Sequence, residues 1–203
     1  MWLVVGLGNP GPQYADNRHN IGFQVVDQLL RRARASGLRT KFGAEIGEAT
    51  IAGERALFCK PMEFMNTSGQ AVARTAKFWK IPVDRTVVVH DDLDLPFARL
   101  KLGAAGGHGG HNGLRSILAD LGSADFARVR IGIGRPAGGG DAADFVLSDF
   151  SKAEGKELPF VVQEAADAVE AIVGQGLPFA MNRFNASKND KHRKKPDGGR
   201  ADD

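Results

Sequence analysis

Short apolar runs bounded by glycine or polar residues predict the strands of a buried sheet. The runs at residues 2–6 and 86–90 are apolar almost throughout, which is typical of strands that are covered on both faces. Leu100 and Leu102 instead alternate with Arg99 and Lys101, the pattern of a half-exposed strand. The other predicted strands are residues 44–51 and 56–59, joined through Gly53, and residues 129–133.

Between these strands, apolar residues at helical spacing predict helices. Thr67 or Ser68 is expected to cap one of them, and Asn112 or Gly113 to open another. Because strands and helices alternate, we expect an α/β fold, a three-layer α/β/α sandwich with a mixed, largely parallel central sheet. The predicted helices are residues 21–30, about 68–79, 112–121, 158–173 and a shorter segment after Pro178.

Beyond about Ser187, apolar residues give way to Lys, Gly and Asp. The sequence therefore predicts one folded domain over residues 1–187 and a disordered basic tail over residues 188–203. The tail holds six Lys or Arg and four Asp, so it supplies +2 of the net charge of +3 and leaves +1 for the domain. A nucleic-acid partner would thus need basic residues that are placed locally.

Cys59 is the only cysteine, and its apolar surroundings predict a buried side chain rather than a nucleophile. No apolar run is long enough to span a membrane. The first residues lack the basic and apolar regions of a signal peptide. We therefore expect a cytoplasmic protein without a membrane partner.

Residues 6–11, Gly-Leu-Gly-Asn-Pro-Gly, match the glycine fingerprint of dinucleotide sites. Such a site needs a helix that begins at the third glycine, but Pro10 and Pro12 flank Gly11 and the helical pattern begins only near residues 17–20. We interpret the glycines as a turn that presents Asn9. A dinucleotide-dependent oxidoreductase is the alternative, and absence of NAD(P) binding would exclude it.

Several predicted strands and loops end in amide, imidazole or carboxylate side chains. Each of these could be an ordinary turn or helix-entry residue. Together they suit hydrolysis, because a histidine oriented by a carboxylate activates water and asparagine amides stabilise an oxyanion. No Gly-x-Ser-x-Gly motif is present, so we expect direct attack by water. The segments are Asn9 with His19 and Asn20, Phe64 to Asn66, His90 to Asp92, and His108 to Asn112.

A metal site is a competing interpretation of the same residues. His90 lies beside Asp91, Asp92 and Asp94, and His108 lies three residues before His111. The glycines around the second pair disfavour the helix that would place both rings on one face. We therefore expect no metal and no other cofactor. Activity that is unchanged by a chelator would remove the metallohydrolase alternative.

Six segments, in order from residue 2 to about 185, resemble the motifs of bacterial-type peptidyl-tRNA hydrolase. They are Gly6 to Gly11, Tyr14 to Gly22, Lys60 to Gly69, His90 to Pro96, Gly109 to Gly113 and Arg130 to Gly134. The resemblance implies a monomeric enzyme, without a cofactor, that cleaves the ester between a peptide and the 3′ end of tRNA. A noncatalytic RNA-binding module, which would bind tRNA without turnover, is the alternative from another class.

The resemblance also implies roles for single residues. His19 would be the general base, Asp91 its partner, and Asn9 a contact to the peptide backbone. The remaining implied contacts are Asn66 and Asn112 to the 3′ end and the reacting carbonyl or water, Tyr14 and Phe64 to the terminal adenosine and peptide, and Met65 and His111 at the flanks of the site.

Basic residues near the site have two interpretations. Arg99, Lys101 and Arg130 could grip the tRNA acceptor arm, or they could be solvated strand residues. Arg130 matches one of the two cations that the family places near the tRNA 5′-phosphate, while Gly103 stands where the other is often found and Lys101 is its expected substitute. Glu63 also departs from the family, which commonly has Thr there.

Overall fold

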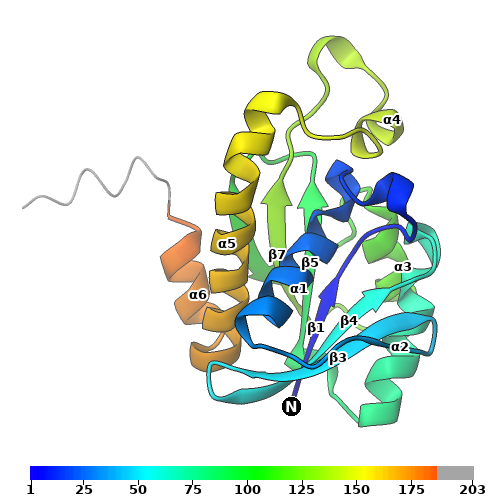
Figure 1. Ribbon diagram of the computed structural model, residues 1–203, viewed down its shortest axis with the longest axis vertical. Helices are drawn as coiled ribbons and strands as arrows, with labels where there is room; N and C mark the ends of the chain where they lie inside the picture. Colours follow the sequence, from blue (N-terminus) through cyan, green and yellow to red (C-terminus); the bar gives the residue numbers. More distant parts are fainter. Residues whose placement is uncertain (187–203) are drawn as a thin grey trace, which may run out of the picture.

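Seven strands form one sheet in the order β2-β3-β4-β1-β5-β7-β6 (Figure 1). The four central strands are parallel, and β2, β3 and β6 add antiparallel pairs at the two edges. This arrangement confirms the predicted mixed sheet. The strands are β1 Trp2–Gly6, β2 Arg39–Lys41, β3 Ala44–Ile51, β4 Glu54–Pro61, β5 Thr86–Asp92, β6 Leu100–Ala104 and β7 Ala127–Gly132.

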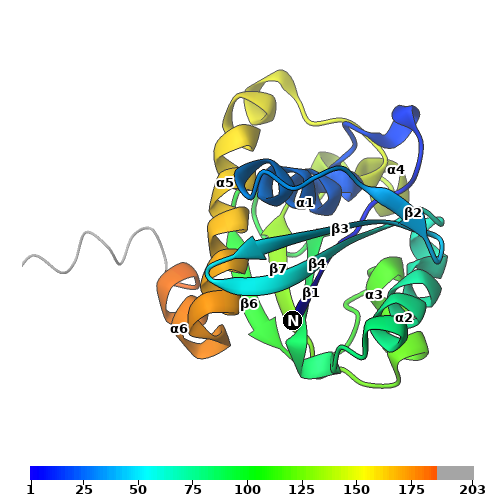
Figure 2. The ribbon, with the colours of Figure 1, turned by 60° about the horizontal axis from the view of Figure 1, so that its bottom comes forward.

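Helices cover both faces of the sheet, as Figure 2 shows. Along β1, Val4 packs into the core beneath α1 and α5, whereas Leu3 and Val5 pack into the core beneath α2 and α3. The period of two along a strand therefore divides the apolar residues between two cores, which confirms the three-layer sandwich. The helices are α1 Ile21–Arg32, α2 Ser68–Trp79, α3 Asn112–Leu121, α4 Ala142–Val146, α5 Lys152–Gln175 and α6 Leu177–Phe184.

The computed structural model describes residues 1–186, so the predicted tail over residues 188–203 lies outside the described residues. Within residues 1–186, no helix has both the length and the apolar character that crossing a membrane requires. Cys59 is fully buried on β4, and burial raises the pKa of its thiol to about 12. The prediction of an inert, buried cysteine is therefore confirmed.

Two helix starts differ from the sequence prediction. Helix α5 begins at Lys152, six residues before the predicted start, because Ser151 and Glu154 form a reciprocal capping box. Thr67 precedes α2 but does not cap it, since its hydroxyl donates instead to the carbonyl of Phe64. The three-residue strand β2 and the five-residue helix α4 were not predicted.

Glycines let α1 lie directly against the sheet. A Cβ atom on Gly22 would lie 2.4 Å from the carbonyl oxygen of Val89, and one on Gly6 would lie 2.3 Å from that of Gly22. Helix α1 begins ten residues after Gly11, behind two short 3-10 turns at Pro12–Tyr14 and Arg18–Asn20. The helix start that a dinucleotide fingerprint requires is therefore not present at Gly11.

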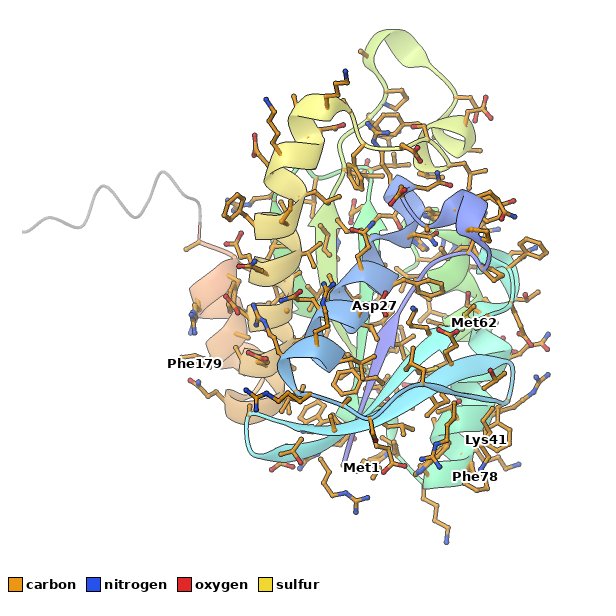
Figure 3. All side chains as sticks on the ribbon, in the orientation of Figure 1. Met1, Asp27, Lys41, Met62, Phe78 and Phe179 are labelled. Atoms are coloured by element: carbon orange, nitrogen blue, oxygen red, sulfur yellow. The ribbon has the colours of Figure 1, made fainter. Side chains whose placement is uncertain are left out.

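Asp27, the acidic residue within the helix that follows that fingerprint, has a structural partner. It projects from α1 (Figure 3), and its carboxylate pairs with Nζ of Lys60 at 2.9 Å. A ribose-binding carboxylate would instead lie at the end of the second strand. The glycine pattern thus serves helix packing and the turn around Asn9.

At the far side of the sheet, a side chain takes the place of a neighbouring strand. Asn185 accepts from the N–H of Leu102 at 2.7 Å and donates to its carbonyl at 2.9 Å. Arg99 donates to the Asn185 carbonyl at 2.9 Å. The outer edge of β6 is therefore covered at its middle residue.

Candidate active site

A cleft of about 1170 Å³ opens at the carboxyl ends of the parallel strands. The glycine-rich segment after β6 forms one wall, and part of α4 forms another. Ten of the eleven predicted site residues line it, and Tyr14 does not. The ten are Asn9, His19, Phe64, Met65, Asn66, Asp91, Lys101, His111, Asn112 and Arg130.

His19 and Asp91 form the centre of the cleft. Nδ1 of His19 lies 2.8 and 2.9 Å from the two carboxylate oxygens of Asp91. A carboxylate accepts hydrogen bonds, so Nδ1 carries the proton and Nε2 has a free lone pair. Within residues 1–186, Nε2 makes no hydrogen bond. His19 is therefore held in the tautomer that can take a proton from water.

His111 approaches Asp91 from the opposite side. Its Nδ1 accepts from the backbone N–H groups of Gly113 at 3.2 Å and Leu114 at 3.4 Å, so Nε2 carries its proton. That Nε2 donates to Oδ1 of Asp91 at 2.9 Å. His111 thus caps α3 and fixes Asp91 with the same ring, a double role that the sequence did not reveal.

Asp91 is ionised in this environment. Burial would raise the pKa of its carboxyl, but the electrostatic interactions and hydrogen bonds with His19 and His111 hold it well below its usual range. The side chain is only 2% exposed. Asp91 is therefore a buried anion whose remaining role is to orient and stabilise the two rings.

Asn9 is fixed by Asn20, which the sequence placed among the candidate segments without assigning it a role. Asn20 accepts from the N–H of Asn9 and donates to its carbonyl, both at 2.9 Å. The side-chain oxygen of Asn9 then accepts from the N–H of Met65 at 2.8 Å. Its NH₂ group, for which residues 1–186 supply no partner, is left to donate within the cleft.

The other predicted contacts surround this centre at the mouth of the cleft. Asn66 lies in the 3-10 turn Met65–Thr67, and Asn112 is the first residue of α3; both are exposed. Phe64 is 61% exposed. Tyr14 is partly exposed in the turn Pro12–Tyr14, outside the cleft lining. These positions leave Asn66, Asn112 and Phe64 free to contact a ligand.

A pair of cations lies on the neighbouring strands. Lys101 of β6 is directly opposite Arg130 of β7, and both line the cleft. Nε of Arg130 donates to Oδ2 of Asp92 at 2.6 Å, which fixes its orientation. Arg99 instead donates to the carbonyl of Asn185 and does not line the cleft, which favours the interpretation of Arg99 as an ordinary strand residue. Glu63, which does not line the cleft, contacts Arg74.

Arg18 holds the α4 wall in place. Its guanidinium donates to Ser148 Oγ and to Glu154 Oε2, each at 2.7 Å, and lies 4.3 Å from the ring centre of Phe145. Because Arg18 precedes His19 in the same turn, the α4 wall is tied directly to the segment that carries the candidate base.

A metal ion could be considered for one group of side chains. Ligand atoms of His19, Asp91 and His111 lie within 4.8 Å of one another. The two ring nitrogens that face Asp91 lie at ordinary hydrogen-bond distances from it and carry protons, whereas a metal ligand must present a lone pair. The donor set therefore fits a hydrogen-bonded triad better than a metal site.

Comparisons with known proteins point to one family. The family model described as "Peptidyl-tRNA hydrolase" matches residues 3–193. The chain is 51% identical to "Peptidyl-tRNA hydrolase" of Frankia casuarinae, over 91% of this chain and 94% of the relative, and 51% identical to that of Chloroflexus aggregans, over 91% and 99%. The crystal structure of peptidyl-tRNA hydrolase from Acinetobacter baumannii superposes with a TM-score of 0.86 at 37% identity, covering 93% of this chain and 96% of the other.

Proposed function

The chain belongs to the peptidyl-tRNA hydrolase family, and from that membership we propose how its residues act. It hydrolyses the ester that joins a peptide to tRNA and so releases the tRNA. It is therefore an enzyme of translation, not a noncatalytic RNA-binding module. The observation that carries the proposed mechanism is the hydrogen bond from His19 Nδ1 to ionised Asp91, which leaves Nε2 as a base in the cleft.

His19 activates the attacking water. Water oxygen bonds to the ester carbonyl carbon while Nε2 of His19 takes one of its protons. The resulting imidazolium is stabilised by the Asp91 carboxylate, which stays unprotonated. When the tetrahedral intermediate collapses, the bond to the ribose oxygen breaks and that oxygen takes the proton back from Nε2. The products are the peptide acid and tRNA with a free 3′ end.

Asparagine side chains position the ester and its charge. The NH₂ group of Asn9, oriented through Met65 and Asn20, donates to the peptide backbone next to the ester. Asn66 and Asn112 face the same space from two elements and contact the 3′ end and the developing oxyanion or the water. A donor of this kind typically contributes about 10²–10³ in rate when it is aimed at an oxyanion.

Lys101 and Arg130 bind the 5′-phosphate of the tRNA. Their side chains project from the same face of adjacent strands, because the two residues are direct cross-strand neighbours. The bond from Arg130 to Asp92 fixes the direction of the guanidinium and leaves its other N–H groups available. Two cations in one place meet the requirement for local positive charge in a domain of low net charge.

The mechanism is tested by removing the base and its partner separately. We expect His19→Ala to lower kcat/KM by about 10²–10⁴-fold on N-acetyl-aminoacyl-tRNA and to abolish the acidic limb of the pH profile. Asp91→Asn should also lower kcat by at least about 10²-fold, because the wrong tautomer becomes available to His19. Steady-state kinetics from pH 5 to 9 would measure both effects.

Asp27→Asn is the matched control, since it removes a carboxylate that pairs with Lys60 outside the cleft. It should retain the activity of the wild type. Equal rates for His19→Ala and the wild type would disprove the proposed base, and a pH profile that Asp91→Asn does not change would disprove the pairing.

A further inference from the structure

The wall of the cleft formed by residues 105–110 is held by very few contacts. It links β6 to α3, and four of its six residues, listed below, have left-handed backbone angles. A Cβ atom on any of its four glycines would meet no atom within 4 Å, so side-chain packing does not fix the segment. The left-handed residues are Ala105, Gly106, Gly109 and Gly110.

One side chain connects this segment to the sheet. Arg128 of β7 donates from Nη1 to the carbonyl of Gly107 and from Nη2 to that of Gly106, each at 2.6 Å. Within residues 1–186, no other hydrogen bond joins residues 105–110 to the rest of the protein, apart from the bond to the adjacent His111. The remaining bonds, to His108 from Gly110 and His111, are local. Arg128 is therefore the anchor of the glycine wall.

Arg128 is built into this position and is not a free surface cation. It is 5% exposed, and its guanidinium lies 4.8 Å from the ring centre of Phe126. Burial, and then the charge of Arg130, lowers the pKa of Arg128, but a guanidinium stays protonated in proteins. Its planar fork matches two consecutive carbonyl groups, which a single ammonium group does less well.

The anchored segment leads directly into the active site. His111, which donates to Asp91, and Asn112, which faces the ester, follow Gly110 without an intervening residue. We propose that Arg128 is a positioning residue for peptidyl-tRNA hydrolysis, which acts by holding the glycine wall so that His111 and Asn112 keep their places. This inference rests on the proposed function of those two residues.

Arg128 differs in this respect from Arg130, which lies two residues away on the same face of β7. Arg130 is half-buried and pairs with a carboxylate at the cleft edge. Both terminal nitrogens of Arg128 are already directed to backbone carbonyls. Arg128 therefore acts through the protein and does not bind RNA phosphate, which gives the two residues different kinetic signatures.

The test compares Arg128→Met and Arg128→Lys with the wild type. We expect Arg128→Met to lower kcat/KM on N-acetyl-aminoacyl-tRNA on the order of 10²-fold, as small misplacements of catalytic groups do, and Arg128→Lys to recover part of the loss. The dependence of KM on salt concentration should stay unchanged, because the phosphate contacts remain. Hydrogen exchange should become faster at the first turn of α3.

Arg99→Met is the matched control. It also removes an arginine that donates to a backbone carbonyl, that of Asn185, but it lies outside the cleft lining. Its kcat/KM should equal that of the wild type. This control separates the loss of a wall anchor from the general cost of losing an arginine on this side of the sheet.

Gly107→Ala supplies a second variant in case Arg128→Met does not fold. Gly107 does not have a left-handed backbone angle, and a Cβ atom there would lie in open space. An alanine at this position therefore stiffens the wall without strain. Added to Arg128→Lys, it should raise kcat/KM several-fold.

Three outcomes would each overturn the inference: wild-type kinetics of Arg128→Met, a reduced salt dependence of KM in that variant, or no gain from Gly107→Ala. If His19→Ala proved fully active, the proposed function would fail instead, while the exchange measurement would still report on the anchor.

Discussion

At the scale of single residues, His90 is buried beside the catalytic pair but outside the proposed proton transfer. Its Nδ1 donates to the carbonyl of Asp91 at 2.7 Å, and Nε2 has no partner within residues 1–186. Burial lowers the pKa of His90 from 6.5 to about 3. His90 is therefore neutral in the native protein at any working pH.

This neutral ring makes stability depend on pH in a defined window. Below pH 6.5 the unfolded chain protonates His90, while the native protein does so only near pH 3, so stability falls as the pH falls. The slope is about 1.4 kcal/mol per pH unit for one proton. The pKa of Asp91 is also lowered, but this group reduces the stability only below a pH of about 3.9, the pKa of an aspartate in the unfolded chain.

We expect His90→Asn to flatten the fall in the free energy of unfolding between pH 6.5 and 4. Asparagine keeps a donor for the Asp91 carbonyl but takes up no proton. Urea titrations of both proteins at four pH values would measure the slopes. Since His19 and His111 are present in both, their contributions cancel, and equal slopes would contradict the assignment to His90.

The site residues whose roles were predicted and those whose roles were missed differ in how the roles arise. His19, Asp91 and the three asparagines could be predicted because they stand in recognisable segments with chemistry of their own. Asn20 and Arg128 act through backbone groups 11 and 21 or more residues away, and such partners exist only after folding. The spacing of Arg128 and Arg130, two residues apart on one strand, was the available signal for Arg128.

At the scale of elements, the close approach of α1 to the sheet sets the position of the catalytic base. The turn Arg18–Asn20 leads directly into α1, whose Gly22 lies against Val89 of β5. Asp91 lies two residues beyond Val89 on the same strand. The distance between α1 and β5 therefore controls the distance between His19 and Asp91.

Gly22→Ala should both destabilise the protein and reduce its activity. The new Cβ atom would meet backbone atoms at 2.4–2.6 Å, so α1 must shift, at a cost of about 1–3 kcal/mol. Thermal unfolding would show a lower Tm, and kcat would fall with the displacement of His19. Gly155→Ala, at an exposed position of α5 with open space around it, should instead raise stability by about 0.5–1 kcal/mol. A Tm of Gly22→Ala equal to that of the wild type would argue against this control by α1.

Elements with an apolar stripe could be predicted, and elements without one could not. The period of Ile21, Val25 and Leu29 was enough to place α1. The first turns of α5 are largely exposed and polar, so the pattern began only at Leu158 although the capping box starts the helix earlier. Strand β2 is exposed at all three residues and is defined by pairing with β3 alone.

At the scale of the whole molecule, the small positive charge is less informative than its distribution. Lys101 and Arg130 meet on adjacent strands beside the cleft, although the net charge of the full chain is only +3. The monomeric state and the cytoplasmic location stay predictions from the sequence and the resemblance. Because these two cations lie apart from the proposed base, their binding of tRNA can be measured separately from catalysis.

Lys101→Ala should raise KM roughly 3- to 10-fold, without changing kcat, by removing one charge-assisted contact. The slope of log kcat/KM against log salt concentration should become shallower by about one unit, as expected for the loss of one phosphate contact. A substrate that lacks the 5′-phosphate should show the same KM with the variant and with the wild type. Lys77→Ala, an equal charge change on α2 outside the cleft, is the control. A KM increase that persists without the 5′-phosphate would assign Lys101 to another contact.

The amide of Asn185 also bears on what happens to the product. Extended peptides can join an open sheet edge through their main chain, as in β-augmentation. Strand β6 lines the cleft, yet the N–H and C=O of its middle residue, Leu102, are already occupied by Asn185. A released peptide that docked there as an eighth strand would therefore have to displace the Asn185 amide from Leu102.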